Sequence, residues 1–189
     1  AVNYLWQHFF GNGLVATPAD FGSQGAAPSH PKLLDWLALE FVERRWSRKD
    51  LVRLIVNSET YRQSSVTTPQ LRAHDPGNLL LARMSRLRLP AEQIRDNALA
   101  VSGLLNPQVG GPPVFPTQPA GLYEERGQNE PGNSNFTWKD SKGEDRYRKS
   151  IYTYWKRMML HPSLATFDGP PRQLCVAKRS ITNTPRQAL

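Results

Sequence analysis

The chain has 189 residues, which suits one domain of good size or one domain with a long decorating loop. Its single cysteine, Cys175, excludes an internal disulfide framework, a cysteine-rich zinc site and a covalent c-type haem within these residues, and no run of about 18 apolar residues predicts a transmembrane helix. The net charge of +8 favours acidic partners, such as nucleic acid, anionic glycans, a membrane surface or an acidic neighbouring domain.

The first residues predict a helix over 2–10, because apolar side chains recur there at helical spacing. Gly11 and Gly13 end this helix, and a loop follows as far as Pro28. The chain begins inside a periodic segment, and it ends on Thr184 and Pro185, a pair typical of a helix start. We therefore expect a fragment of a longer protein.

Residues 29–65 predict a helical hairpin around which the rest of the chain is organised. Ser29 is suited to be an N-cap, with Pro31 in the first turn. Ser47 and Asp50 form the pattern of a capping box that starts the second helix. The apolar face of the first helix is predicted to hold Leu33, Leu34, Leu37, Ala38, Phe41 and Val42. The aromatic residues Trp36, Phe41 and Trp46 are interpreted as core packing.

The middle of the chain predicts two more helices and a long loop. A polar connection and a turn at 75–77 precede a predicted helix over 79–87, and Pro90 opens the next helix. Its expected inner stripe is Ile94, Ala98, Val101 and Leu105. Residues 106–147 are rich in Gly, Pro, Asn and Gln and are predicted to form a long surface loop of the single domain 1–189.

The C-terminal part predicts a small two-stranded β element. Residues 150–157 are rich in β-branched and aromatic residues, and 175–181 is the expected partner strand, with a short helix over 162–167 between them. Residues 151–189 carry six bases against one acid. The predicted fold class is therefore mainly α: a helical bundle around the central hairpin, with a long irregular loop and this β element.

The motifs taken in order resemble a known family. They are WQHFFGNGLV, DFGSQG, PSHPKLLDWLA, LIVNSETYRQSS, RLRLPAEQIRDNALAVSGLL, GGPPVFP, SIYTYWKR, TFDGPPR and TNTPRQAL. Together they resemble the planctomycete secreted domain, an uncharacterised domain found C-terminal in exported proteins of the planctomycete cytochrome c type. The resemblance implies export to the periplasm or cell surface, a mostly helical fold and haem c in another domain of the full-length protein. It implies no established reaction.

Two sets of residues are candidates for chemistry or binding. His8 and His30 could converge with Asp20 or Asp35 into a small metal or acid–base cluster, although capping and buried hydrogen bonding are commoner roles for such histidines. The second set interleaves aromatic rings with bases, as in sites that stack sugars or nucleobases. It comprises Tyr152, Tyr154, Trp155, Lys156 and Arg157, with Trp138 from the long loop.

No recognisable catalytic motif is present, so whether the chain is an enzyme stays open. Arg62, Arg95 and Asp96 are interpreted as structural ion pairs near the hairpin. The leading hypothesis is an accessory or interaction domain that docks against other domains of the same protein. The alternative is a carbohydrate-directed module or enzyme that uses the 112–146 loop and residues 151–157, with an anionic glycan as one candidate partner. Nucleic-acid binding is the least favoured hypothesis.

Overall fold

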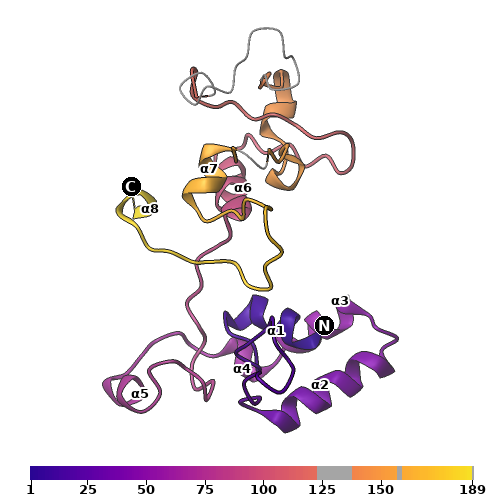
Figure 1. The fold of residues 1–189 in the computed structure, drawn as a ribbon, viewed down its shortest axis with the longest axis vertical. Helices are drawn as coiled ribbons and strands as arrows, with labels where there is room; N and C mark the ends of the chain where they lie inside the picture. The colour runs from indigo at the N-terminus through magenta and orange to yellow at the C-terminus, as the bar shows by residue number, and fades with distance from the viewer. Residues whose placement is uncertain (123–137, 157–158, 189) are drawn as a thin grey trace. The chain divides into compact units, whose positions relative to one another are not determined.

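The computed structural model describes residues 1–122, 138–156 and 159–188 (Figure 1). The described residues are rich in helix and form isolated β-bridges but no sheet, which confirms the prediction of a mainly α fold. By its contacts the chain divides into two compact units. Unit 1 comprises Ala1–Arg88 with Val176–Lys178, and unit 2 comprises Leu89–Cys175 with Arg179–Leu189. The predicted single domain with a loop over 106–147 stays a prediction, as does the bundle.

The core of unit 1 is made by α1 (Val2–Phe10), α2 (Pro31–Glu43) and α3 (Arg48–Val56). Because apolar residues recur every three or four positions, each helix turns one apolar face inward. The fully buried cluster consists of Val2, Trp6, Phe10, Leu14, Leu37, Phe41, Leu51 and Ile55. The two helices expected from the central hairpin are confirmed, and α1 supplies three members of this cluster while α2 and α3 supply two each.

The loop after α1 is fastened by a buried amide. The side chain of Asn3 donates to the Val15 carbonyl at 3.1 Å and accepts from the Val15 amide at 2.8 Å. A side chain at Gly13 would lie 2.6 Å from the Asn3 amide nitrogen, so only glycine fits beside it. This contact brings Leu14 into the apolar cluster.

The corner between α2 and α3 is a Schellman motif. The Trp46 amide donates to the Phe41 carbonyl at 2.8 Å and the Arg45 amide to the Val42 carbonyl at 2.9 Å. Arg45 takes the left-handed conformation, with φ of 54°, at the position where glycine is commonest. The predicted capping box begins α3, since the Ser47 hydroxyl accepts from the Asp50 amide at 3.3 Å. His30, rather than the predicted Ser29, is the N-cap of α2.

The helix predicted over 79–87 is wrong. After the short helices α4 (Glu59–Arg62) and α5 (Pro69–His74), the buried Asp75 carboxylate accepts from the amides of Leu79 and Leu80, both at 2.8 Å. Leu81 then adopts a positive φ of 56°. The carboxylate takes up amides that would open a helix, and the chain leaves as an extended segment.

In unit 2, α6 (Ala91–Val101) packs against α7 (Pro162–Thr166) and the 3₁₀ helix η3 (Ser150–Tyr152). The predicted helices here are confirmed, but the inner stripe of α6 is not as predicted: Val101 is 83% exposed and Ala98 is also exposed. Arg95 and Asp96 connect this helix by hydrogen bonds to residues 146–150. The remaining elements are η2 (Gly143–Tyr147) and α8 (Pro185–Ala188).

The predicted two-stranded element is also wrong in the described residues. Ser150–Tyr152 is a 3₁₀ helix, and its first amide, that of Ser150, donates to the Asp96 carboxylate at 2.7 Å instead of to a neighbouring strand. Thr153 forms an isolated parallel bridge to Val114 instead of pairing with 175–181. The latter segment has no strand, and its Arg179 pairs with Glu92 of α6 at 2.8 Å.

Candidate functional site

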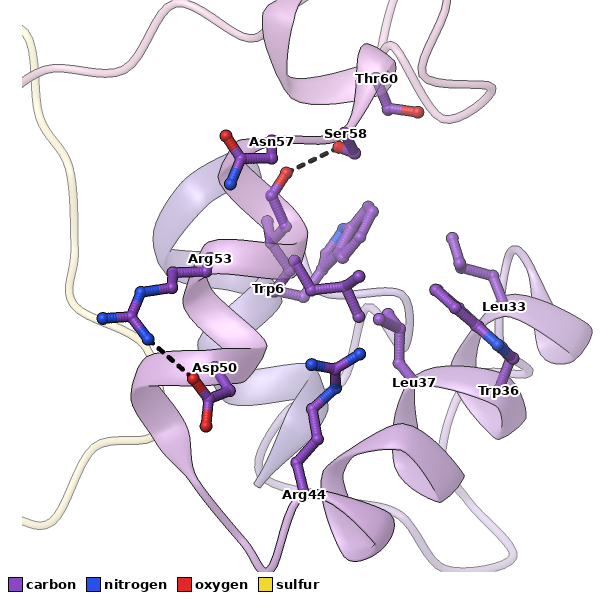
Figure 2. Close-up of a pocket in the computed structure, with 12 residues that line it drawn as sticks. Trp6, Leu33, Trp36, Leu37, Arg44, Asp50, Arg53, Asn57, Ser58 and Thr60 are labelled. Atoms are coloured by element: carbon purple, nitrogen blue, oxygen red, sulfur yellow. Dashed lines mark hydrogen bonds and ion pairs between the residues drawn. The ribbon is translucent and has the colours of Figure 1, made fainter.

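The best candidate site in unit 1 is a groove between α2 and α3 with a volume of about 410 Å³. We call it the α2–α3 groove (Figure 2). Its lining comprises Trp6, Leu33, Trp36, Leu37, Arg44, Asp50, Arg53, Leu54, Ile55, Asn57, Ser58 and Thr60. A pocket of this size with an apolar lining and a few polar groups is the usual form of a binding site.

The floor of the groove belongs to the core, whereas one wall is exposed. Trp6, Leu37 and Ile55 are buried members of the apolar cluster. Trp36 is 46% exposed and stands with Leu33 on the α2 side of the opening, across from α3 (Figure 2). The interpretation of Trp36 as core packing is therefore wrong, as it is for the exposed Trp46, while Phe41 is buried as predicted.

The rim of the groove is charged. Arg44 points its guanidinium toward the space between α3 and Leu37 (Figure 2) and pairs with Glu40 at 2.8 Å. Asp50 pairs with Arg53 at 2.9 Å. Hydrogen bonding by the Ser47 side chain lowers the pKa of Asp50 below its ordinary value, and Arg53 acts in the same direction. The rim thus holds fixed charges of both signs next to an apolar floor.

The predicted aromatic–basic set of unit 2 is brought together only in part. The rings of Trp138 and Tyr154 lie 6.5 Å apart, and Phe115 stacks on Tyr154 at 4.9 Å. Trp138 donates its indole N–H to the Pro116 carbonyl at 3.0 Å. These three rings, Phe115, Trp138 and Tyr154, form what we call the aromatic cluster, to which His161 adds a ring 5.8 Å from Trp138.

The other members of that set lie apart from the cluster. The Tyr152 hydroxyl accepts from the Gly110 amide at 2.8 Å, and Arg148 lies over the ring at 4.2 Å. Trp155 lies under Arg172 at 4.1 Å. Burial lowers the pKa of the half-buried Lys156. Arg157 lies outside the described residues.

The residues of the predicted polar cluster each have a local partner. The His8 ring contacts Tyr4 at 4.6 Å, Asp20 accepts from the Gly22 amide at 2.9 Å, and His30 lies 3.0 Å from the Ser29 hydroxyl. Among the described residues, no group of three or more His, Cys, Asp or Glu side chains is arranged to hold a metal ion. The cluster stays a prediction, and Cys175 is free and exposed.

Arg95 and Asp96 act within unit 2 rather than beside the hairpin. Arg95 donates to the carbonyls of Arg148 at 3.0 Å and Arg146 at 2.8 Å, and it lies 3.8 Å from Asp96. Both side chains stabilise this part of the chain, and their main partners are backbone groups in and beside the short 3₁₀ helices η2 and η3 rather than each other.

Sequence reasoning missed the α2–α3 groove. Trp36 lies outside the face that Leu33, Leu37 and Phe41 form on α2, and that position was the available signal. The pairing of α2 with α3 was readable from the capping residues, but the space left between them depends on side-chain packing across both helices.

The described residues define a helix-rich protein with an open apolar groove in unit 1. None of its described helices is long and apolar enough to cross a bilayer. The chain belongs to the family described as PSD1, protein of unknown function (DUF1553), whose sequence model matches residues 1–189. No curated protein and no solved structure matches it.

Proposed function

We propose that this chain is an interaction domain that docks onto another domain of a larger exported protein through the α2–α3 groove. The observation that carries the proposal is the half-exposed Trp36 beside an apolar floor in a groove of about 410 Å³. Aromatic anchors seated in apolar pockets supply much of the binding energy of interfaces. An apolar surface with a polar rim marks such sites.

Charge favours an acidic apolar segment as the occupant. The corner beside the groove carries Arg44, Arg45, Arg48, Lys49 and Arg53 within ten residues. Arg44 and Arg53 have intramolecular carboxylate partners, whereas Arg48 and Lys49 are exposed and make no ion pair with the described residues. A segment that places apolar side chains on Trp36 and carboxylates near Arg48 and Lys49 matches both features.

The proposal includes the expectations drawn from the family resemblance. The full-length protein is exported to the periplasm or cell surface, and haem c is carried by another of its domains, of the planctomycete cytochrome type. The docking role requires no reaction by these 189 residues themselves.

The test is site-specific photo-crosslinking in the full-length protein. A photoreactive phenylalanine analogue at Trp36 should crosslink to an acidic segment outside residues 1–189. The same analogue at Val66, which is exposed in unit 1 and lies outside the groove, is the control. Equal crosslinking from both positions, or crosslinks confined to residues 1–189, would contradict docking through the groove.

Charge reversal tests the nature of the partner. The double variant Arg48→Glu/Lys49→Glu should reduce the Trp36 crosslink and its sensitivity to salt, because it removes attraction to carboxylates. Arg62→Glu/Arg72→Glu changes the charge equally on exposed positions of α4 and α5. If both doubles act alike, the partner is not an acidic segment that recognises this corner.

The aromatic cluster favours carbohydrate binding as a second candidate function. Trp138 and Tyr154 meet although they are distant in sequence, and Tyr154 is 42% exposed. Exposed aromatic faces can stack on sugar rings. On a glycan array, Tyr154→Ala should abolish binding while Tyr4→Ala, an exposed tyrosine of unit 1, should not. An array without any binding by the unmodified chain would end this candidate.

A further inference from the structure

Unit 2 contains a second pocket, of about 300 Å³, whose polar lining is cationic. The polar residues around it are Arg95, Thr117, Arg146, Tyr147, His161 and Ser163. Among the residues that the structure describes, the lining includes two guanidinium groups and no carboxylate. This composition differs from that of the α2–α3 groove, where Asp50 and Glu40 neutralise the arginines.

Arg95 is a fixed positive charge in this pocket. Its Nη1 donates to the Arg148 carbonyl and to the Ser150 hydroxyl at 3.1 Å, and its Nη2 to the Arg146 carbonyl. Asp96 lies 3.8 Å away and accepts from the Ser150 amide, so its charge is shared between two groups. Carbonyls orient the guanidinium but do not cancel its charge.

Arg146 supplies a hydrogen-bond donor, its Nε, that the described residues do not use. Its Nε is shielded from solvent and has no hydrogen-bond partner within the described residues. The guanidinium carbon lies 5.8 Å from the centre of the Tyr147 ring. A shielded donor without a partner costs free energy, and a ligand that accepts from it recovers that cost.

His161 orders the opposite side of the pocket, and its burial favours the neutral form of the ring. Its Nε2 lies 3.2 Å from the Thr117 carbonyl, which only accepts, so Nε2 carries the proton. Nδ1 then accepts from the Ser163 hydroxyl at 2.8 Å. Burial lowers the pKa of His161, and the charge of Arg95 lowers it further. The ring therefore adds no charge to the pocket but fixes its wall.

We propose that this pocket binds an oxyanion: the carboxylate, sulfate or phosphate group of a small ligand. Arg146 donates to the oxyanion, because a guanidinium matches two oxygens of such a group with parallel N–H bonds. Arg95 contributes attraction from a position fixed by its carbonyl partners. This site is independent of the α2–α3 groove, so either proposal can fail alone.

The experiment titrates the chain at constant ionic strength with sodium sulfate, phosphate or acetate against sodium chloride. Binding is followed through the ring ¹⁵N resonances of His161. The expected result is a saturable shift of His161 and none of His8 or His30, which lie in unit 1 and serve as internal references. No saturable shift with any of the three anions overturns the proposal.

Variants assign the shift to the pocket. Arg146→Gln should weaken binding by about tenfold or more, the value of a charged hydrogen bond. Arg146→Lys keeps the charge but lacks the planar guanidinium, so its affinity should lie between those of Arg146→Gln and the unmodified chain. Lys149→Gln removes a nearby charge outside the lining and should bind like the unmodified chain. Arg146→Gln leaves the backbone carbonyl that Arg95 needs, and unchanged binding in it overturns the proposal.

The oxyanion can be a free inorganic ion or a group on an organic ligand. Titrations with glucuronate and glucose 6-sulfate, compared with glucose, distinguish these two sources. Tighter binding of either charged sugar than of the inorganic ions assigns the group to an organic ligand. Equal binding assigns the pocket to the free anion. Binding of glucose as tight as that of its charged derivatives would overturn oxyanion recognition.

Discussion

Unit 1 and unit 2 are stabilised in different ways. The core of unit 1 consists of apolar side chains, nearly all of them on three helices that satisfy their own backbone hydrogen bonds. The described part of unit 2 buries fewer large apolar side chains, and Arg148, Ser150, Thr153 and His161 are among its buried residues. Arginines there donate to carbonyls of irregular segments. Where regular secondary structure is absent, side-chain donors must satisfy the backbone carbonyls that a helix satisfies with its own amides.

The largest expected effect comes from breaking this device in unit 2. Arg148 is 2% exposed and donates to the carbonyls of Pro112 and Gly110. Arg148→Met leaves these carbonyls unsatisfied and should lower the free energy of unfolding by about 4 kcal/mol, since hydrogen bonds to charged groups contribute about 1.5–3 kcal/mol each. Hydrogen exchange should show lost protection in α6 and retained protection in α3.

The matched control for this prediction is the neighbouring Lys149→Met, which should change stability by about 0.5 kcal/mol or less. If Arg148→Met were as stable as Lys149→Met, the buried guanidinium would not be what holds unit 2, and the contrast between the units would disappear.

The corresponding change in unit 1 removes apolar packing. Leu51 is fully buried, at 0% exposure, so Leu51→Ala should cost about 3 kcal/mol through lost contacts and a residual cavity. Chemical denaturation measures the loss, and hydrogen exchange should locate it in α1, α2 and α3. Leu39→Ala, on the exposed side of α2, should have little effect. Similar losses for both leucines would mean that the cluster does not dominate unit 1.

The same contrast explains what the sequence could predict. Helices α2 and α3 were readable because Pro31, Ser47 and Asp50 act on their immediate neighbours. The segment 150–157 was predicted as a strand because its side chains favour extended backbone. Within this segment Thr153 pairs with Val114 in an isolated bridge. Val114 lies in an irregular stretch, and no local sequence pattern indicates this pairing. Long-range pairing of this kind depends on the whole fold.

The site residues likewise divide into those that a local sequence pattern indicates and those that depend on long-range packing. Trp138 and Tyr154, which composition places in one candidate set, lie with their rings 6.5 Å apart, and their role in binding stays a prediction. His161 and Arg146 were not selected, because their importance arises from a pocket formed by segments far apart in sequence. The prediction of a helix over Leu79–Leu87 is wrong because it rests on the spacing of the leucines alone. The Asp75 carboxylate binds the amides of Leu79 and Leu80, and only the structure shows these hydrogen bonds.

A smaller expected effect concerns the helix cap of unit 1. Ser47→Ala should destabilise by about 1 kcal/mol, because the α3 amide of Asp50 loses its acceptor. Ser47→Asp, which restores an acceptor, should recover most of the loss in thermal denaturation. Helix α6 of unit 2 has Pro90 as its N-cap and no side-chain cap, whereas α3, α4 and α5 of unit 1 are each capped by a hydroxyl. If the Asp variant were no better than the Ala variant, the hydroxyl would serve packing instead.

The smallest effect should appear only in acid and only through unit 2. The pKa of His161 lies below its ordinary value of 6.5, first because of burial and then because of Arg95, although hydrogen bonding to Thr117 and the charge of Asp140 oppose this. The unfolded chain therefore binds a proton more readily than the folded chain. The stabilisation of the folded chain by neutral His161 is fully present above pH 6.5 and is lost as the pH falls through the lower folded-state pKa.

Denaturation at several pH values measures this dependence. In His161→Gln the free energy of unfolding should fall less steeply in acid, whereas His74→Gln, exposed in unit 1, should show the same acid dependence as the unmodified chain. An unchanged slope in His161→Gln would assign the acid sensitivity to carboxylates and remove the histidine from the list of features that distinguish the two units.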